Sequence, residues 1–229
     1  MFCPECAQLN LQKLEELKEP IACIDAIHSS KAAEKGTPND AWGMVSKLAI
    51  CNGARVMLTW NMCASKGLCN GSLGTVKAII YKPGEKPPHL PKAVIVQFDH
   101  FTGESILPDC PRCVAITPFS AEWIKNRQTH RREQIPLVLA WAITIHKSQG
   151  QTLNKIWITL GQRHQAGSEY VAVTRVRKLE DLIIDGVSWE RFQKINTVDK
   201  KRRKEEQRLE NMYAEVLEKY KDMEIENHC

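Results

Sequence analysis

An uninterrupted apolar run near the middle of the chain constrains the fold more than any other feature. It covers residues 136–143, Pro-Leu-Val-Leu-Ala-Trp-Ala-Ile, and the polar decapeptide 144–153 follows it directly. Such a run is too short for a typical buried helix and is typical of a strand buried on both faces. Ligands of open α/β sheets bind at the carboxyl ends of such strands. We therefore expect the decapeptide to form a binding site where the chain leaves a buried strand.

The decapeptide itself reads Thr-Ile-His-Lys-Ser-Gln-Gly-Gln-Thr-Leu. Its hydroxyls, imidazole, ammonium and amides can donate to phosphate oxygens without a pocket for a base. A second polar cluster, residues 169–177, contains Arg175 beside the hydroxyl of Thr174. A guanidinium that is always charged and fork-shaped suits a transferring phosphoryl group. Both clusters therefore favour phosphate chemistry.

Together these clusters resemble two late motifs of superfamily-1 DNA helicases of the Pif type and their eukaryotic relatives, including those encoded by Helitron transposons. Two further stretches resemble the same family in the family's order: residues 52–61, which residues 67–76 continue, and residues 132–137. The resemblance covers residues 9–195. Four blocks in the family's order make a chance match improbable, whereas one block of seven residues would be weak support.

The resemblance implies an α/β fold in which residues 8–71 and 131–195 form a second RecA-like motor domain with a parallel sheet, as in P-loop NTPases. Residues 72–130 would form an inserted β-barrel resembling a Src-homology-3 (SH3) domain. The sequence supports an insertion of this kind, because several short strand patterns separated by turn signals are typical of small barrels. Residues 196–229 would form a charged helical tail.

Hydrophobic periodicity predicts the elements of the motor domain. Residues 8–19 fit an amphipathic helix. From residue 136 onward the pattern alternates strand and helix, with strands at 136–143, 155–160 and 181–185. This alternation predicts a parallel βαβαβ arrangement.

The tail allows two interpretations. Its apolar residues Leu209, Met212, Val216 and Tyr220 recur at helical spacing and form one narrow stripe. The tail is then a solvated helix that packs one edge on the motor. Alternatively, the basic residues 200–204 serve nuclear import or contact nucleic acid.

The resemblance assigns the nucleotide site to four residues. Arg175 would be an arginine finger at the γ-phosphate of ATP, with a surface arginine in an ion pair as the alternative. Gln149 and Gly150 would face the nucleotide. Tyr170 would line the same cleft or pack in the core, and its sequence context favours neither.

The resemblance also assigns contacts with single-stranded DNA. The residues that would donate to DNA phosphates are Thr144, His146, Lys147 and Ser148. For His146 a purely structural role is the alternative. Arg55 and Asn61 are weaker candidates. Trp60 departs from the smaller or charged residue expected in the family, and either stacks on a base or, as we favour, covers the barrel.

The chain lacks part of a complete motor. No G-x-x-x-x-G-K-[ST] loop and no acidic pair suited to magnesium occurs in the sequence. The chain therefore looks like the carboxyl-terminal half of a 5′-to-3′ helicase of DNA repair and recombination, as a fragment, a truncated gene copy or a subunit. ATP and Mg²⁺ would be held mainly by a missing amino-terminal RecA-like half, in the same chain or as a partner. The alternative is a non-catalytic, transposon-derived remnant or interaction module.

Composition adds weaker constraints. A net charge of +5 and a pI near 8.7 permit a polyanionic partner without demanding one. Nine cysteines, an odd number scattered through apolar segments, are typical of a reducing intracellular compartment, here nuclear or mitochondrial. The sequence contains neither a secretory signal nor a run of eighteen apolar residues, so we expect no membrane association.

Two C-x-x-C pairs bear on metal binding. Cys3 and Cys6 form one pair, and Cys110 and Cys113 form the other. Two such pairs together can hold zinc. They lie far apart in the sequence and the family places no metal there, so we expect incidental thiols and no zinc.

Overall fold

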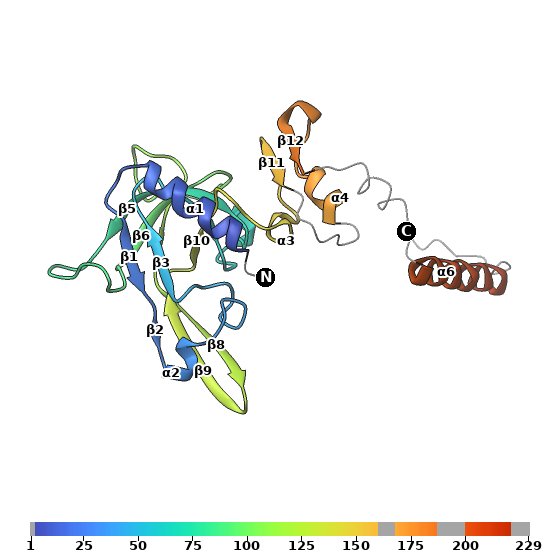
Figure 1. Ribbon diagram of the computed structural model, residues 1–229, viewed down its shortest axis with the longest axis horizontal. Helices are drawn as coiled ribbons and strands as arrows, with labels where there is room; N and C mark the ends of the chain where they lie inside the picture. The colour runs from blue at the N-terminus through green and yellow to red at the C-terminus, as the bar shows by residue number, and fades with distance from the viewer. Residues whose placement is uncertain (1–2, 160–167, 187–199, 221–229) are drawn as a thin grey trace, which may run out of the picture. The chain divides into compact units, whose positions relative to one another are not determined.

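The computed structural model describes residues 3–159, 168–186 and 200–220 (Figure 1). It divides into two compact units, residues 1–151 and 152–229, and each is described by itself. The helices and strands of the first unit, in chain order, are α1 (Pro4–Glu16), β1 (Ala22–Asp25), β2 (Ile27–His28), α2 (Lys31–Glu34), β3 (Lys47–Ile50), β4 (Arg55–Leu58), η1 (Ala64–Lys66), β5 (Leu73–Ile80), β6 (Ala93–Phe98), β7 (Cys113–Ile116), β8 (Phe119–Lys125), β9 (Gln128–Gln134), β10 (Leu137–Leu139) and α3 (Ile145–Ser148). Those of the second unit are β11 (Ile156–Thr159), α4 (Ser168–Val173), η2 (Leu179–Asp181), β12 (Leu182–Asp185) and α6 (Lys200–Lys219).

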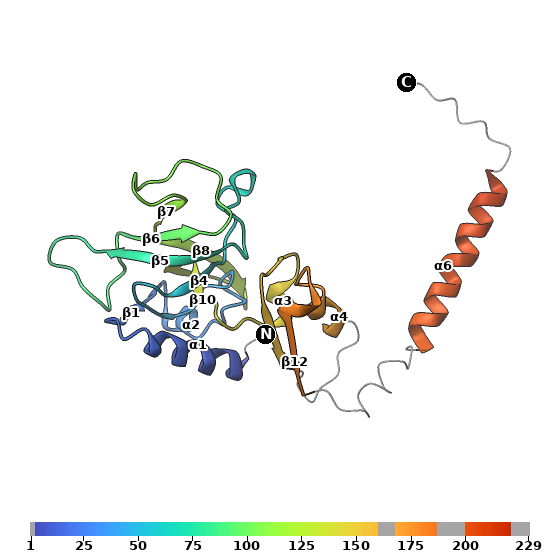
Figure 2. The same ribbon diagram turned by 90° about the horizontal axis from the view of Figure 1, so that it is seen from above.

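A five-stranded antiparallel sheet with the strand order β10-β4-β5-β6-β7 forms the centre of the first unit. Figure 2 shows β4, β5 and β6 side by side within it. Val94, Val96 and Phe98 of β6 are almost completely buried, and Ile95 on the opposite face is 4% exposed. A short β-branched strand with both faces buried is therefore the middle of the core, as its sequence pattern predicts.

The predicted parallel pairing of residues 136–143 is wrong. Only Leu137–Leu139 are strand, and this β10 pairs antiparallel with β4, placing Leu137 opposite Leu58. Leu137 and Val138 are buried, as the apolar run predicts. The run specifies burial but not the neighbouring strand, because that partner lies some eighty residues earlier in the chain.

The strands predicted for the barrel share this sheet with strands outside the predicted range. β5, β6 and β7 lie within residues 72–130, whereas β4 and β10 flank that range and extend the same sheet. The predicted boundary at residue 72 therefore falls between two paired strands. An SH3-like barrel at 72–130 stays a prediction.

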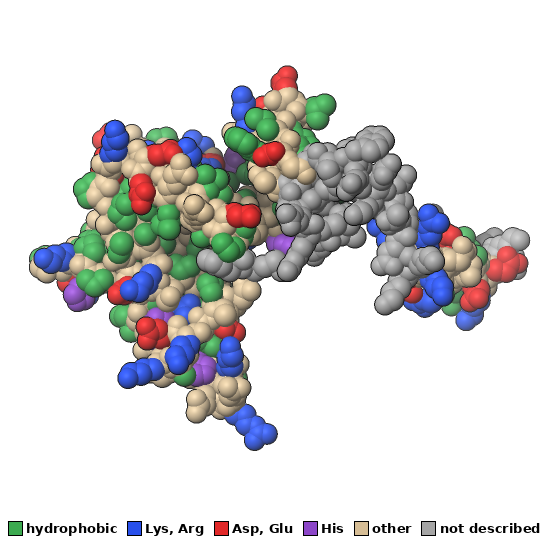
Figure 3. Space-filling view, viewed as in Figure 1, with side chains coloured by type: hydrophobic (Ala, Val, Ile, Leu, Met, Phe, Trp, Pro, Cys, Tyr) green, Lys and Arg blue, Asp and Glu red, His purple; other side chains and the backbone are tan. Residues whose placement is uncertain are grey.

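A second sheet of the first unit consists of β2, β9 and β8. Its β8–β9 hairpin projects from the rest of the unit (Figure 1). Asn126 and Arg127 at the tip both have positive φ angles, of 52° and 61°, as a two-residue hairpin turn requires. Lys and Arg side chains gather on this projection (Figure 3).

The base of the hairpin contains Arg132, a fully buried arginine. Its guanidinium donates to the Met44 carbonyl at 2.8 Å and to the Gly36 carbonyl at 2.7 Å. Longer bonds reach the carbonyls of Ala33 and Glu34. Burial lowers the pKa of Arg132, but an arginine keeps its charge in proteins. One buried cation thus holds both ends of the loop between α2 and β3.

Trp123 of β8 completes this anchor. The Arg132 guanidinium lies 5.8 Å from the centre of its ring, a cation–π distance. A Cβ atom added to Gly36 would lie 2.6 Å from the same ring. The loop can therefore pass over Trp123 only because residue 36 has no side chain.

The helix α1 begins four residues before the predicted start at residue 8. Pro4 occupies its first turn and the Cys3 sulfur accepts from the Cys6 amide at 3.5 Å. Proline is favoured at this position because its missing N–H has no partner there in any case. Leu14 is the residue of α1 that enters the hydrophobic core.

The second unit pairs β11 with β12 in parallel, with Ile156 opposite Leu182. This confirms the strand–helix–strand pattern predicted after residue 155. Apolar side chains of α6 remain solvent-exposed, including Leu209 at 52% and Val216 at 51%. Residues 196–199 and 221–229 of the predicted tail lie outside the described residues. Within the described part, no helix has the length and apolar character needed to cross a bilayer.

We expect Arg132→Ala to lower the free energy of unfolding of the first unit by about 3 kcal/mol or more, because several buried carbonyls lose their donor. Urea denaturation followed by circular dichroism measures this change. Arg131→Ala is the matched control, because Arg131 is exposed on the same strand and should change stability by less than about 0.5 kcal/mol. Equal stability of the two variants would refute the anchoring role of Arg132.

Candidate nucleotide and nucleic-acid site

Part of the decapeptide lines an open cleft of about 500 Å³ in the first unit. His146, Lys147, Gln149 and Gln151 form one side of this cleft. The other lining residues come from three distant segments of the chain and are Asn39, Trp42, Gly43, Met57, Thr59, Asn70 and Gly71. The fold thus surrounds the decapeptide with side chains that sequence reasoning did not assign to a site.

The helix α3 is a single turn that sets the direction of these side chains. Thr144 precedes it with extended backbone, and its carbonyl accepts from the amides of Lys147 at 2.9 Å and Ser148 at 3.2 Å. The hydroxyl of Ser148 is buried and donates to the Ile145 carbonyl at 2.7 Å. This geometry assigns Ser148 to the turn itself, so it does not support the predicted phosphate contact of Ser148.

Asn10 of α1 fixes the segment that leads into α3. Its side-chain amide donates to the Ala142 carbonyl at 2.8 Å, and its oxygen accepts from the Ala142 amide at 2.9 Å. Asn10 is 8% exposed, so both bonds are largely shielded from water. Two reciprocal bonds to one residue restrain both position and rotation of the backbone.

The far end of the turn packs closely against the β4–β5 connection. Gln151 donates from its side chain to the Lys147 carbonyl at 2.9 Å. Gly71 has a φ of +99°, and a Cβ atom there would lie 3.1 Å from the Gln151 amide nitrogen. Gly150 has a φ of +80° and faces open space. Glycine is the residue that accepts such backbone at no steric cost.

Lys147 supplies the positive charge of the cleft. His146 and Lys147 are both exposed at its surface. Desolvation lowers the pKa of the Lys147 ammonium, and the nearby Cys6 opposes that shift. The Cys6 thiol is itself held neutral, because burial and then the adjacent Cys3 raise its pKa to about 12. Lys147 is thus the cation of the cleft, and it lies near an uncharged thiol.

Three aromatic rings form a stack beside the cleft. The rings of Trp42 and Trp60 are stacked with centroids 4.6 Å apart, and Trp60 stacks on Phe119 at 4.7 Å. Trp60 stacks on both of the other rings, and its predicted role of covering the barrel stays a prediction. Trp42, the outer ring, was not recognised in the sequence, because no local pattern relates it to Trp60 or to the decapeptide.

The two weaker candidates from the sequence have structural partners. Arg55 forms a bidentate ion pair with Asp99, which joins β4 to the end of β6. The Asn61 oxygen accepts from the Asn70 amide at 2.7 Å and shapes the loop before β5. Neither side chain lines the cleft.

Arg175 and Tyr170 belong to the second unit. The Arg175 guanidinium donates to the Val171 carbonyl at 2.6 Å and to the Thr174 hydroxyl at 2.8 Å, folding back on the end of α4. The Arg175 carbonyl accepts from the Leu153 amide at 2.7 Å, which ties α4 to the end of the decapeptide. Tyr170 is 72% exposed, so the alternative that it packs in the core is wrong.

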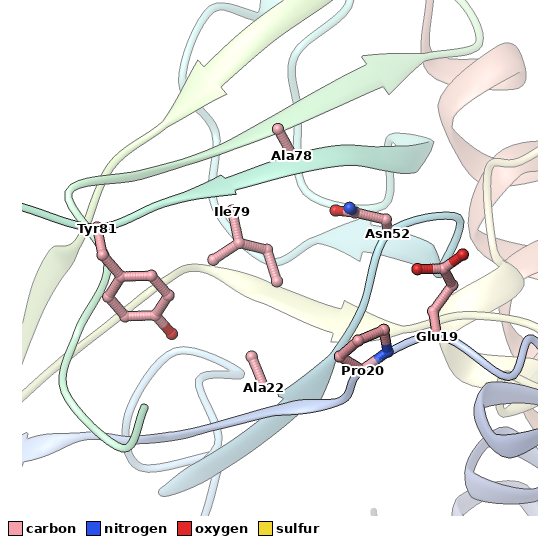
Figure 4. Close-up of a pocket in the computed structure, with 7 residues that line it drawn as sticks. All are labelled: Glu19, Pro20, Ala22, Asn52, Ala78, Ile79 and Tyr81. Carbon is pink, nitrogen blue, oxygen red and sulfur yellow. The ribbon is translucent and has the colours of Figure 1, made fainter. Parts of the chain in front are cut away.

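A second cavity of about 340 Å³ involves none of the predicted site residues. It is lined by Glu19, Pro20, Ala22, Asn52, Ala78, Ile79 and Tyr81 (Figure 4). Burial raises the pKa of Tyr81. Because this cavity contains no cation, whereas Lys147 and three further residues of the decapeptide line the cleft beside α3, that cleft is the better candidate site.

The C-x-x-C pairs lie in separate places. Cys3 and Cys6 occupy the start of α1, whereas the Cys113 thiol donates to the Cys110 sulfur at 2.8 Å beside β7. Within residues 3–159, 168–186 and 200–220, no three His, Cys, Asp or Glu side chains come together as a metal site would require. The expected absence of zinc stays a prediction.

Comparison with known proteins finds matches to one class, the ATP-dependent DNA helicases. The ATP-dependent DNA helicase PIF1 of Xenopus laevis is 34% identical over 176 residues, or 76% of this chain and 25% of that protein. Unliganded Pif1 from Bacteroides sp. has 29% identity and a TM-score of 0.56, over 81% of this chain and 39% of that one. Bacteroides Pif1 in complex with ADP-AlF3 and ssDNA has 28% identity and a TM-score of 0.55, over 80% of this chain and 39% of that one.

The chain is thus a homologue of Pif1-family DNA helicases over about four-fifths of its length. It spans about a quarter of the length of the curated PIF1 relatives it matches. No protein-family model matches it. The resemblance found in the sequence is therefore confirmed for the family, while its Helitron-like branch stays a prediction.

We expect Asn10→Ala to destabilise the first unit by about 1–3 kcal/mol, because the Ala142 amide and carbonyl each lose a shielded partner. Hydrogen exchange of the α3 amides should accelerate by more than that of β6. Gln12→Ala is the control, because Gln12 is exposed on the same helix. Unchanged exchange in α3 would contradict the view that Asn10 fixes the site.

Proposed function

We propose that this chain is the carboxyl-terminal half of an ATP-dependent 5′-to-3′ DNA helicase, which holds single-stranded DNA and completes an ATP site. The observation that carries the proposal is the cleft beside α3, where an exposed cation and an imidazole meet on one restrained turn. Homology to Pif1-family helicases supports it. A structural homologue is known in complex with ssDNA and ADP-AlF3.

The DNA contacts of the proposal use the phosphates of the strand. Lys147 contributes an ammonium, while His146 and the exposed backbone around it contribute further hydrogen-bond donors. Such contacts position a strand without reading its sequence. Binding is therefore expected to be independent of sequence and sensitive to salt.

The nucleotide contacts of the proposal use Gln149, Gly150 and Arg175. ATP itself would supply the phosphoryl group and the free energy for movement, and Mg²⁺ would neutralise its phosphates. The described residues offer a guanidinium but no acidic cluster for a metal, and the sequence has no phosphate-cradling glycine loop. We infer that the remaining ATP and magnesium contacts come from an amino-terminal RecA-like half, in the same chain or as a partner.

Lys147→Ala should weaken single-stranded DNA binding and reduce its salt dependence. One lost phosphate contact lowers the slope of log affinity against log salt by about 0.7 for a single strand. His146→Ala should also lower affinity, because the strand loses a hydrogen-bond partner on the same turn. Fluorescence anisotropy of a labelled oligonucleotide across a salt series measures both effects.

The matched control for this comparison is Lys86→Ala. Lys86 is exposed in the β5–β6 loop, and the substitution removes the same charge. An unchanged salt slope in Lys147→Ala, or an equal change in Lys86→Ala, would contradict a phosphate contact at Lys147.

The chain by itself should hydrolyse no ATP, because it lacks the loop that cradles the phosphates. Steady-state ATPase measurements with saturating single-stranded DNA test this expectation. Turnover of about 1 per second or faster is within the ordinary range of enzymes. Such turnover in a preparation free of other ATPases would refute the proposal that ATP hydrolysis needs an amino-terminal half.

With an amino-terminal half supplied, Arg175→Ala should lower DNA-stimulated turnover by roughly a thousandfold or more, the scale of known arginine fingers. ATP affinity should fall much less, because the finger acts on charge that develops during transfer. Arg175→Lys should restore little of the lost turnover, because an ammonium lacks the planar, fork-shaped geometry of a guanidinium. The guanidinium must first leave the Val171 carbonyl that it contacts in this structure.

Arg177, an exposed arginine two residues away, is the nearest alternative finger, so Arg177→Ala is tested beside Arg175→Ala. Turnover of Arg175→Ala within about threefold of the parent would exclude the finger role, since such fingers contribute a thousandfold or more.

A further inference from the structure

The cleft beside α3 carries two features that phosphate binding does not use. One is Trp42, which lines the cleft and is 44% exposed despite its large apolar ring. The other is Thr59, which also lines the cleft and is only 5% exposed. Its buried hydroxyl has no hydrogen-bond partner among the residues that the structure describes.

Trp42 is the exposed end of the aromatic stack formed with Trp60 and Phe119. Its ring is inclined by only 20° to that of Trp60 and lies 6.1 Å from that of Phe119, so two rings back a partly exposed aromatic surface. Unpaired bases stack on such surfaces in proteins that bind single strands. A ring backed by two others cannot turn inward to hide from water, which makes Trp42 a preformed platform.

The backbone at Trp42 is held in an uncommon conformation. Its φ is +53°, which few residues other than glycine adopt, and Gly43 follows with +85°. The Gly43 amide donates to the Pro38 carbonyl at 2.7 Å and the Met44 carbonyl accepts from buried Arg132 at 2.8 Å. The fold therefore restrains the platform from both sides.

Thr59 lies directly beneath this turn. A Cβ atom on Gly43 would be 3.2 Å from the Thr59 Cβ, so the two segments are in close contact. A buried hydroxyl without a partner destabilises the folded state, and nearly all buried polar groups of folded proteins are paired with protein atoms or ordered water. Because Thr59 borders the cleft, a polar atom of a bound molecule can supply the missing hydrogen bond.

We propose that this cleft binds one unpaired nucleotide of single-stranded DNA. Its base stacks on Trp42, a polar edge of the nucleotide bonds to the Thr59 hydroxyl, and its phosphate lies near Lys147. The volume of about 500 Å³ is ample for one nucleotide and falls in the range of small-molecule sites, roughly 300–1,000 Å³. The proposal rests on the proposed function and adds a base contact to it.

The full chain is tested against two labelled strands of equal length, an oligothymidylate and an abasic deoxyribose-phosphate chain. The parent should bind the oligothymidylate more tightly. Trp42→Ala should weaken that binding by roughly five- to 150-fold, the range for loss of one base–aromatic stack. Its affinity for the abasic strand should not change. Trp42→Phe should retain most of the discrimination, because it keeps an aromatic face.

Two further variants separate binding from folding. Trp157→Ala removes another exposed tryptophan, 70% exposed on β11, and should leave both affinities unchanged. Thr59→Val has almost the same shape as the parent residue but no hydroxyl. It should raise the melting temperature and weaken binding of the oligothymidylate, because the hydroxyl is unsatisfied without ligand and bonded with it.

Each part of the proposal would be refuted by a different experimental outcome. If Trp42→Ala weakens both strands equally, Trp42 acts through the fold and the platform is refuted. If the parent binds both strands equally, the base contact is refuted while phosphate binding stands. If Thr59→Val binds the oligothymidylate as the parent does, the hydroxyl contact is refuted. If the parent binds neither strand, the proposed function fails as well.

Discussion

The buried guanidinium of Arg132 is the interaction on which the site most depends. It joins the base of the β8–β9 hairpin to the carbonyls of Gly36 and Met44, at the two ends of the loop that carries Trp42. No carboxylate among the described residues forms an ion pair with it, although the charge of Asp40 raises its pKa; neutral carbonyls and the Trp123 ring surround the guanidinium. The two terminal nitrogens of the guanidinium are hydrogen-bonded, and a charge buried in this way is tolerated only with such partners, so the loop has little freedom to move.

The opposite side of the cleft is restrained by different means. Asn10 fixes the backbone before α3 with two bonds to Ala142, and Gln151 closes the turn after it through the Lys147 carbonyl. A four-residue helix has no stability of its own, since helix formation needs many residues to offset nucleation. The position of Lys147 is therefore determined by tertiary contacts. The cleft is rigid because hydrogen bonds to other parts of the fold restrain both segments that line it.

Local patterns predicted the parts of this structure that depend on local causes. The alternation in β6, the parallel β11–β12 pair and the polar turn after residue 143 are all visible in the sequence. The pairing of β10 with β4 was mispredicted, and the roles of Trp42 and Thr59 were missed, because each depends on contacts between distant segments. Ser148 shows the same limit: its type suits a phosphate, but its hydroxyl is used within the turn.

The central claim is that the cleft beside α3 is where this homologue of Pif1-family helicases holds single-stranded DNA. Photocrosslinking with an oligonucleotide that carries 5-iodouracil tests it most directly, because this base couples to aromatic rings that it stacks on. The account predicts a crosslink in the peptide that contains Trp42, and its loss in excess unlabelled single strand. Crosslinks confined to the β8–β9 hairpin or to α6, with Trp42 unmodified, would contradict it.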